Sequence, residues 1–340
     1  MEISMLGLDL AKQSFQVHGV DAAGAVVVRR SLRRGQLERY FAGLSPCVVG
    51  MEACATSHHW ARVIGALGHE VRLLPTKTVK AYVRRGKNDA LDAQAICEAA
   101  SRPDVRLVAA KSPEQQSVLM LHKSRDLLIR QRTMLVNALR GHLAEFGIVA
   151  AKGGAGATQL LALLRRGDPG LPALAQRALL PLADQLENAT RQILALEREI
   201  LAWHRSDAIS QRLAEIPGIG LLGATALAAV LRHADHFSSA RAFAASLGLT
   251  PKQDTTGGKV RLRSISKMGN GYLRRLLVLG ATSQLRRAAK ATTQAAAWTR
   301  ALRARRPARV VAVALANKTA RIAWALVAHQ RAYEPNHQPC

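Results

Sequence analysis

The stretch ISMLGLDLAKQSFQVHGVDAAGAVVVRRSL, residues 3–32, decides the fold of the N-terminal part of the chain. Its short apolar runs, separated by turn-forming residues, predict three consecutive antiparallel strands at 3–9, 14–20 and 24–31. Asp9 lies inside the first of these strands, where a carboxylate has no role as a helix cap or a turn residue. Asp9 is therefore a candidate functional residue.

The rest of the first 105 residues alternates between strand and helix patterns. We predict further strands at 47–52 and 70–74, and helices at about 35–44, 57–67, 76–84 and 89–101. Strands interleaved with helices in this way are typical of an α/β domain built on one mixed sheet. We place this domain at residues 1–105.

Three further carboxylates occur where they could join Asp9. Glu52 closes the apolar run of CVVGMEA, residues 47–53, and Asp89 and Asp92 lie in KNDALDA, residues 87–93. Because Asp89 and Asp92 are three residues apart at the start of a predicted helix, they share one helical face. Two strand ends and one helical turn can meet at a single point. Taken singly, each of these acids could instead be a cap or a turn residue.

Carboxylates held close together repel one another unless a cation lies between them, and Mg²⁺ or Mn²⁺ suits such oxygen ligands. A pair of such ions about 3.5–4 Å apart is a common device for phosphodiester chemistry. The four acids therefore predict a metal-dependent site that acts on a phosphodiester.

The charge of the chain also indicates a nucleic-acid partner. Among 340 residues there are 49 Lys and Arg against 23 Asp and Glu, which gives a net charge of +26 and a pI near 11.3. From Thr255 to Tyr333 there are no acids, and a solvated surface would normally carry both signs. This excess predicts a phosphate-binding surface whose affinity falls steeply as salt rises.

Other classes of protein fit the sequence less well. We find no uninterrupted apolar run of about 18–20 residues and no signal-peptide pattern, so we expect no membrane partner. The cysteines Cys47, Cys54, Cys97 and Cys340 form no CxxC pair and are expected to be reduced thiols in a cytosolic protein. Aromatic residues make up only 4% of the chain, so stacking surfaces for single strands are sparse.

The middle of the chain, residues 106–210, predicts long helices. One begins at Pro113 and ends before Gly147, and a second, at 182–204, has apolar residues at heptad-like intervals. Between them, the stretch 153–157 is rich in Gly and Ala and predicts a break, followed by a small helical insert. Such helices would form a coiled-coil arm that joins two protomers or holds nucleic acid. The alternative is a purely intramolecular hairpin.

The third region, residues 211–335, is basic and mainly helical. The stretch IPGIG, residues 216–220, precedes an apolar helix and predicts a helix-hairpin-helix, in which Gly218 and Gly220 let backbone N–H groups approach a phosphate. A plain packing corner is the alternative. A Gly- and hydroxyl-rich loop then runs into a basic helix.

The order of these blocks resembles one known family. GLDLAK, GMEA, KNDALDA, IPGIG, ASLGLTP, the Gly-rich loop and ISKMGNGYLRRLL occur in the order found in the DEDD insertion-sequence transposases, over residues 6 to about 279. These are RuvC-like site-specific recombinases directed by a structured noncoding RNA made from their own element. The resemblance implies a ribonuclease-H-like N-terminal domain with Asp9, Glu52, Asp89 and Asp92 as its metal ligands, joined by the coiled coil to a C-terminal transposase domain.

The resemblance also implies a nucleophilic serine before a glycine in the Gly-rich loop. This chain has PKQDTTGGK there, so Thr256 occupies the matching position. Its hydroxyl has the same chemistry, although the β-methyl group crowds attack on phosphorus. Ser264 or Ser266 could serve instead, or the threonines could merely shape a turn in an inactive copy.

Basic residues near the loop could neutralise the phosphate or bind the nucleic-acid backbone. The candidates are Lys259, Arg261, Arg263, Lys267, Arg274 and Arg275.

By this resemblance the chain is expected to be a bacterial transposase of the cytoplasm and nucleoid. Its expected partners are double-stranded DNA, at the element ends and the target, and a guide RNA, and it is expected to act as a homodimer or homotetramer. Two alternatives remain: a RuvC-like nuclease that cuts branched DNA with metal-activated water, and an architectural nucleic-acid-binding protein whose acids are structural.

Overall fold

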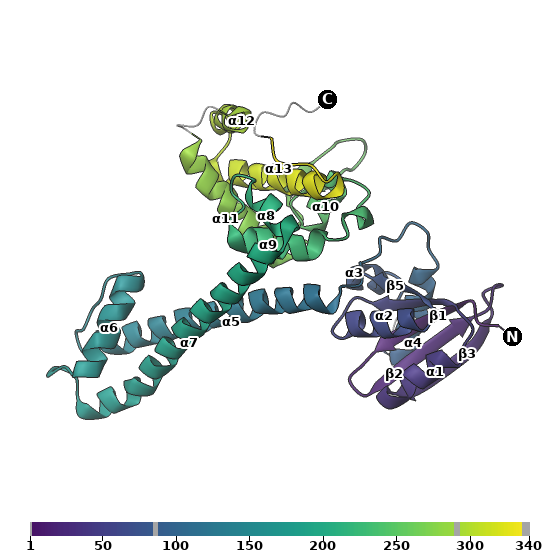
Figure 1. Ribbon diagram of the computed structural model, residues 1–340, viewed down its shortest axis with the longest axis horizontal. Coiled ribbons are helices and arrows are strands. Elements are labelled where there is room, and N and C mark those ends of the chain that lie inside the picture. Colours follow the sequence, from purple (N-terminus) through teal and green to yellow (C-terminus); the bar gives the residue numbers. More distant parts are fainter. Residues whose placement is uncertain (1, 84–87, 289–292, 335–340) are drawn as a thin grey trace. The chain divides into compact units, whose positions relative to one another are not determined.

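The computed structural model describes residues 2–83, 88–288 and 293–334. Lys290, one of the basic residues of the acid-free stretch, lies outside the described residues, as do Cys340 and the expected helix end at position 84. The chain forms two compact units, Met1–Glu114 and Gln115–Cys340 (Figure 1). Each is described here by itself.

The N-terminal unit contains the predicted mixed sheet of five strands (Figure 1). The strands are β1 (Met5–Leu10), β2 (Ser14–Val20), β3 (Val26–Arg33), β4 (Val48–Glu52) and β5 (Glu70–Leu74), and they lie in the order β3-β2-β1-β4-β5. β1, β2 and β3 pair antiparallel, whereas β4 pairs parallel with both β1 and β5. Asp9 therefore lies in the central strand, as the sequence predicted.

The two faces of this sheet are covered by different helices. On one face, α1 (Leu37–Ala42) and α2 (Ser57–Ala66) pack on a core that includes Leu6, Leu8, Val49 and Met51. On the other face lie α3 (Thr76–Lys80) and α4 (Asp89–Ala100), with a smaller core around Ile96. The helix expected at 35–44 starts as a 3₁₀ turn, η1 (Arg34–Gln36), and α3 ends earlier than expected.

Three helices form the first part of the C-terminal unit: α5 (Pro113–Ala144), α6 (Gly154–Arg166) and α7 (Ala173–Ser206). Two predicted boundaries were wrong. Most of the expected break at 153–157 is the first turn of α6, and α7 begins at Ala173 and contains Pro181. Leu179 and Ala183, on either side of Pro181, are both buried, so tertiary packing outweighs the preference of proline for a helix start.

A leucine-rich cluster holds these three helices together near α6. Its buried members are Leu139, Leu143, Leu160, Leu163, Leu164, Leu171, Leu179, Ala183 and Leu186. In α7 the buried residues Leu186, Ile193 and Ile200 recur every seven positions, which is the spacing that predicted a coiled coil. The supercoil itself stays a prediction.

The remaining helices of this unit are α8 (Ala208–Ala214), α9 (Leu221–Leu231), the 3₁₀ turn η2 (Ala234–His236), α10 (Ala240–Ser246), α11 (Gly271–Arg287), α12 (Gln294–Arg303) and α13 (Ala308–Ala328). Residues of α8, α9, α10, α11 and α13 form one apolar core, and α12 packs against α13. Between α10 and α11 the expected loop contains a short antiparallel hairpin, β6 (Pro251–Gln253) and β7 (Leu262–Ile265), which the sequence analysis did not predict.

Helix α13 is long and apolar enough, by length and composition alone, to cross a membrane. A search for uninterrupted apolar runs missed it because Arg309, Lys318 and Arg321 interrupt the pattern. Its buried residues, among them Leu315 and Ala320, belong to the core of the C-terminal unit, and α10 and α11 pack against it. A core helix of a globular domain has this composition.

Candidate catalytic site and nucleic-acid interface

Three of the four predicted acids converge in the N-terminal unit. Ligand oxygens of Asp9, Asp89 and Asp92 all lie within 4.8 Å of one another. Asp9 comes from β1, and the other two come from the first turn of α4, one helical turn apart. The side chain of Asn88 caps this helix by accepting a hydrogen bond from the Ala90 N–H at 3.0 Å. The N-terminal end of a helix also favours negative charge, which stabilises both aspartates there.

A glycine lets α4 come close enough to β1 for these carboxylates to meet. Side chains alternate along β1, so Gly7 and Asp9 face α4 while Leu6 and Leu8 face the other core. A Cβ atom added at Gly7 would lie 2.1 Å from the Ala93 carbonyl oxygen. Only glycine fits there, and Asp9 is the next residue along the same face.

Glu52 belongs to the same face of the sheet but not to the tight group. It ends β4, whose Val49 and Met51 point into the opposite core, and at Gly50 a Cβ atom would lie 2.5 Å from that of Ala100 in α4. Glu52 is near enough for its charge to act on Asp9. Its carboxylate oxygens are not among those that lie within 4.8 Å of one another in the described residues.

The electrostatics of this site disfavour negative charge on Asp9. Burial, and after it the charges of Asp92, Asp89 and Glu52 in that order of importance, together raise the pKa of Asp9 to about 6. A hydrogen bond from the Leu10 backbone acts in the opposite direction. A divalent cation would remove this repulsion, and the donor set, which consists only of carboxylate oxygens, suits Mg²⁺ or Mn²⁺. The residues therefore fit such an ion.

Thr256 lies at the tip of the β6–β7 hairpin in the C-terminal unit. Thr256 and Lys259 form an isolated antiparallel bridge, and the Lys259 N–H donates to the Thr256 carbonyl oxygen at 3.1 Å. Gly257 and Gly258, between them, have φ values of 56° and 75°, as a type I′ hairpin turn requires. Residues 251–260 are all exposed, and no atom lies within 4 Å of a Cβ built on either glycine. The turn is therefore open to a large ligand.

The basic residues of the hairpin differ in their partners. Lys259 and Arg261 are exposed, whereas Arg263 pairs with Asp254 at 2.6 Å. Lys267 follows the hairpin with a left-handed backbone, φ 54°. The hairpin therefore presents exposed cations next to Thr256.

The two candidate arginines of α11 make contacts within the unit. Arg274 donates to the carbonyl oxygens of Leu247 and Met268, each at 2.8 Å. Arg275 pairs with Asp126 and lies over the Tyr272 ring at 5.2 Å. Both side chains therefore support the fold, and phosphate binding by them stays a prediction.

The IPGIG stretch forms a tight turn between α8 and α9, as predicted. Gly218 has φ 86°, and Gly220 is the N-cap of α9. Helix α11 packs directly on this turn, because a Cβ at Gly280 would lie 1.8 Å from the Gly218 oxygen, and Gln284 donates to the Pro217 carbonyl. This contact explains the glycine at 280 by packing, and the left-handed backbone explains the glycine at 218. Phosphate binding there stays a prediction.

Comparisons with known proteins bear on the same regions. A family model described as "Transposase", for the DEDD type of IS110 elements, matches residues 6–148, and one described as "Transposase IS116/IS110/IS902 family" matches residues 210–297. The chain is 50% identical over 337 residues to a "Probable family 20 transposase" of Pseudomonas aeruginosa, covering 98% of this chain and 100% of that protein. The chain belongs to the IS110/IS116 family of insertion-sequence transposases.

Two other relatives are similar over nearly their whole length. The transposase is 40% identical to the "Transposase for insertion sequence element IS1328" of Yersinia enterocolitica, covering 95% of this chain and 96% of that one. It is 39% identical to the "Transposase for insertion sequence element IS1111A" of Coxiella burnetii, covering 98% and 92%. The region matched by the first family model, residues 6–148, contains all four acids. The region matched by the second, residues 210–297, contains Thr256 and the basic residues around it.

The structure adds two residues that the sequence analysis did not assign to the carboxylate site of the transposase. Asn88 fixes the start of α4 as its N-cap. Its role could have been predicted, because asparagine is a preferred N-cap residue and stands directly before the acidic first turn. Cys54 follows Glu52, and its thiol lies near the acids: burial raises its pKa, and the charges of Glu52 and Asp9 raise it further. No sequence pattern indicated that position.

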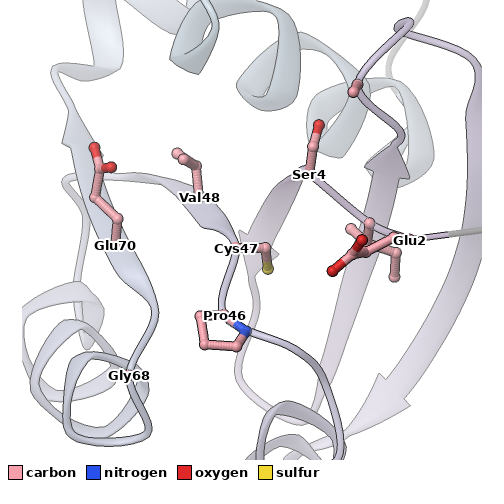
Figure 2. A pocket seen from close by; sticks show the side chains of 9 residues that line it. Glu2, Ser4, Pro46, Cys47, Val48, Gly68 and Glu70 are labelled. Carbon is pink, nitrogen blue, oxygen red and sulfur yellow. The ribbon is translucent and has the colours of Figure 1, made fainter.

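A hollow of about 420 Å³ lies elsewhere in the N-terminal unit of the transposase (Figure 2). It is lined by residues such as Ser4, Pro46 and Val48, which precede or begin β1 and β4. Asp9 and Glu52 lie near the other ends of these strands. The carboxylate site is therefore separate from this hollow.

Proposed function

We propose that this transposase cuts and rejoins DNA at the ends of its own element and at a target, with Mg²⁺ held in a RuvC-like, ribonuclease-H-like domain. The observation that carries the proposal is the convergence of Asp9, Asp89 and Asp92 from a central strand and a helix start. Burial and the neighbouring acids raise the pKa of Asp9 there. Structural acids are normally spread or paired with bases, whereas none of these three acids forms an ion pair with a lysine or arginine among the residues that the structure describes.

Asp9, Asp89 and Asp92 would hold the ion, and Glu52 would complete the set from the end of β4. A divalent ion in such a site polarises a phosphodiester and stabilises the oxygen that leaves. The protein's own part is to hold the four carboxylates near one another and aimed at one point. The close packing of α4 on Gly7 and Gly50 supports that alignment.

The nucleophile we propose is the hydroxyl of Thr256. Its oxygen attacks a DNA phosphorus, its proton passes to a base, and the bond from phosphorus to the departing DNA oxygen breaks. The strand is then attached to Thr256 until a second DNA hydroxyl displaces it and restores the threonine. The open Gly257-Gly258 turn and the exposed Lys259 and Arg261 support this role, because a phosphate can approach there closely.

The partners follow from charge and from the family resemblance. A net charge of +26 supports binding of double-stranded DNA and of a structured noncoding guide RNA. In this proposal residues 1–105 hold the metal, residues 106–210 form a coiled-coil connector, and residues 211–335 carry the nucleophile. The active form is a homodimer or homotetramer in the bacterial cytoplasm, at the nucleoid.

Covalent trapping tests this proposal. The protein is incubated with element-end DNA, Mg²⁺ and RNA transcribed from the flanking region, then denatured, and the protein–DNA adduct is measured by gel electrophoresis. We expect an adduct with the unmodified protein, none with Thr256→Ala, and an equal or larger amount with Thr256→Ser, because serine lacks the crowding methyl group. Thr255→Ala is the matched control and should keep the adduct.

Other results would assign the chemistry differently. Loss of the adduct with Ser264→Ala or Ser266→Ala, but not with Thr256→Ala, would move the nucleophile along the hairpin. Metal-dependent cleavage without an adduct in any variant would favour a RuvC-like nuclease that uses activated water. Binding of nucleic acid without any metal-dependent cleavage would favour an architectural role.

A further inference from the structure

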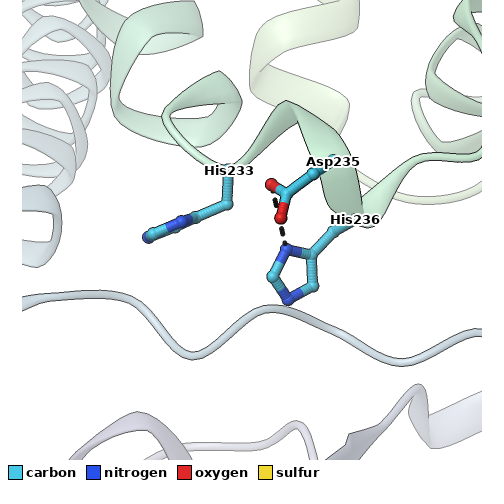
Figure 3. A group of neighbouring side chains, drawn as sticks. All are labelled: His233, Asp235 and His236. Atoms are coloured by element: carbon cyan, nitrogen blue, oxygen red, sulfur yellow. Dashed lines mark ion pairs between the residues drawn. The ribbon is translucent and has the colours of Figure 1, made fainter. Parts of the chain in front are cut away.

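A second group of metal-ligating side chains lies in the C-terminal unit, in the turn after α9. Ligand atoms of His233, Asp235 and His236 all lie within 4.8 Å of one another. The three side chains project from the same side of the turn, and Asp235 contacts His236 at 3.6 Å from Oδ1 to Nδ1 (Figure 3). Neither the family resemblance nor the proposed catalysis uses these residues.

The local backbone brings the two histidines together. His233 is the N-cap of the 3₁₀ turn η2, and the His236 N–H donates to the His233 carbonyl oxygen at 3.3 Å. A 3₁₀ turn has about three residues per turn, so positions three apart lie above one another. The two imidazole rings are accordingly 5.7 Å apart between centroids and nearly perpendicular, at 70°.

The core of the unit fixes this turn in place. Ala234 is only 6% exposed, and its carbonyl oxygen accepts a hydrogen bond from the Trp324 indole N–H of α13 at 2.9 Å. On the other side, Phe237 packs edge-on against Phe243 of α10, with ring centroids 5.0 Å apart. The backbone that carries the three ligands is therefore ordered before any ion binds, which lowers the entropic cost of binding.

The charge of Asp235 is available to an ion. Residues 211–340 contain only four acids, Glu215, Asp235, Asp254 and Glu334. Asp254 pairs with an arginine, whereas the ion pair of Asp235 among the described residues is with His236, inside the group itself. Asp235 is 82% exposed and His236 40% exposed as side chains, so an ion in solution can reach them.

The donor types distinguish this group from the carboxylate site. Two imidazoles and one carboxylate suit Zn²⁺, Ni²⁺ or Co²⁺, whereas Mg²⁺ prefers oxygen ligands only. Zinc takes such ligands at about 2.0–2.2 Å, and three protein ligands leave a position open to water. The side chains need only small rotations to close around one ion, because their ligand atoms are already within 4.8 Å.

We propose that His233, Asp235 and His236 form a binding site for one divalent transition-metal ion of the zinc class. The ion would tie both ends of the η2 turn to each other and so brace the connection from α9 to α10. The site is distinct from the carboxylate site in the other unit.

Calorimetric titration of the full-length protein with Zn²⁺ tests this site, in an Asp9→Asn background and with excess Mg²⁺ so that the carboxylate site contributes little. We expect one equivalent of Zn²⁺ to bind. His233→Ala and His236→Ala should each weaken that binding by about tenfold or more, since loss of even an outer-shell partner costs about that much. The control, His142→Ala, removes an exposed histidine of α5 and should leave the binding unchanged.

Cobalt provides an independent readout. Co²⁺ in a site with His ligands absorbs visible light, and this absorption should be lost in both histidine variants and reduced in Asp235→Asn. Circular dichroism of the variants should match that of the parent, because the three side chains are solvent-accessible. Zinc binding that is equally strong in His236→Ala and in His142→Ala would overturn the proposal, as would a cobalt spectrum that none of these substitutions changes.

Discussion

The carboxylate site and the Thr256 hairpin are built in opposite ways. The carboxylates lie between a central strand and a packed helix, and burial and mutual repulsion raise the pKa of Asp9 to about 6. Thr256 lies on an exposed two-stranded hairpin, and no atom lies within 4 Å of a Cβ built on either glycine of its turn. A change in the first region should therefore alter both stability and metal binding, whereas a change at the hairpin tip should alter chemistry alone.

The largest effect is expected at the centre of the carboxylate site. Asp9→Asn should lower strand cleavage by about a hundredfold or more, because a metal ion of this kind contributes several kcal/mol to the transition state. Binding of DNA or RNA should remain, since the basic surface is intact. Cleavage assays and filter binding would measure the two properties separately.

Glu98→Gln is the matched control for that variant. Glu98 lies on the same helix, α4, and its carboxylate pairs with Arg102 on the surface. The Glu98→Gln variant should cleave DNA strands at the same rate as the unmodified protein. Full activity of Asp9→Asn would show that the carboxylate group is structural.

The close approach of β1 and α4 can be tested with glycines. In Gly7→Ala the new methyl group would meet the Ala93 carbonyl at 2.1 Å, so we expect a loss of about 1–3 kcal/mol in the free energy of unfolding. Gly65→Ala, in helix α2 where no atom lies within 4 Å, should instead stabilise by about 0.5–1 kcal/mol. Urea unfolding measures both, and equal effects would mean that the contact of Gly7 with α4 is unimportant.

The basic surface should show the same contrast between exposed and packed residues. Lys259→Ala with Arg261→Ala should lower the slope of log affinity against log salt by up to about two units if both side chains contact phosphate. Arg274→Ala with Arg275→Ala should mainly lower the unfolding temperature, because these side chains have partners in the fold.

Salt titrations of DNA binding, together with thermal unfolding, separate these outcomes. An unchanged slope in the hairpin pair and a flattened slope in the α11 pair would place the phosphate contacts on α11.

The smallest effect concerns the metal-free protein. Because the folded-state pKa of Asp9 lies above its unfolded value, the native state binds the proton more tightly, and ionising Asp9 lowers stability as pH rises from about 4 to about 6. In EDTA at pH 7.5, Asp9→Asn should therefore raise the unfolding temperature of the N-terminal unit by about 2–4 °C.

This gain should shrink as the pH is lowered through about 6, because Asp9 of the unmodified protein then becomes neutral too. Added Mg²⁺ should stabilise the unmodified protein but not the variant. A gain that is independent of pH would show that charge on Asp9 is not its cause. Differential scanning calorimetry at several pH values makes the comparison.

The strands and helices of the N-terminal unit were predictable because their patterns are local. β2 and β5 have the predicted bounds. In the C-terminal unit, α5 runs from Pro113 to Ala144, also close to the prediction. The errors came where tertiary packing decides: Pro181 lies inside α7, and Gly154–Ala157 are helical. The long apolar helix α13 was missed because charged residues interrupt its apolar sequence. The β6–β7 hairpin was missed because its strands are short and exposed.

The sequence by itself determined the types of ligand and the elements that carry them: Asp9 inside a strand, Glu52 at a strand end, and Asp89 and Asp92 on one helical turn. It also determined the positive charge of the C-terminal region. Spacing along a chain cannot say how near two elements pack, however, because that depends on what lies between them. Only the tertiary structure showed that Gly7 lets α4 reach β1 and that Arg274 and Arg275 have partners in the fold. It also showed that His233, Asp235 and His236 share one side of an exposed turn.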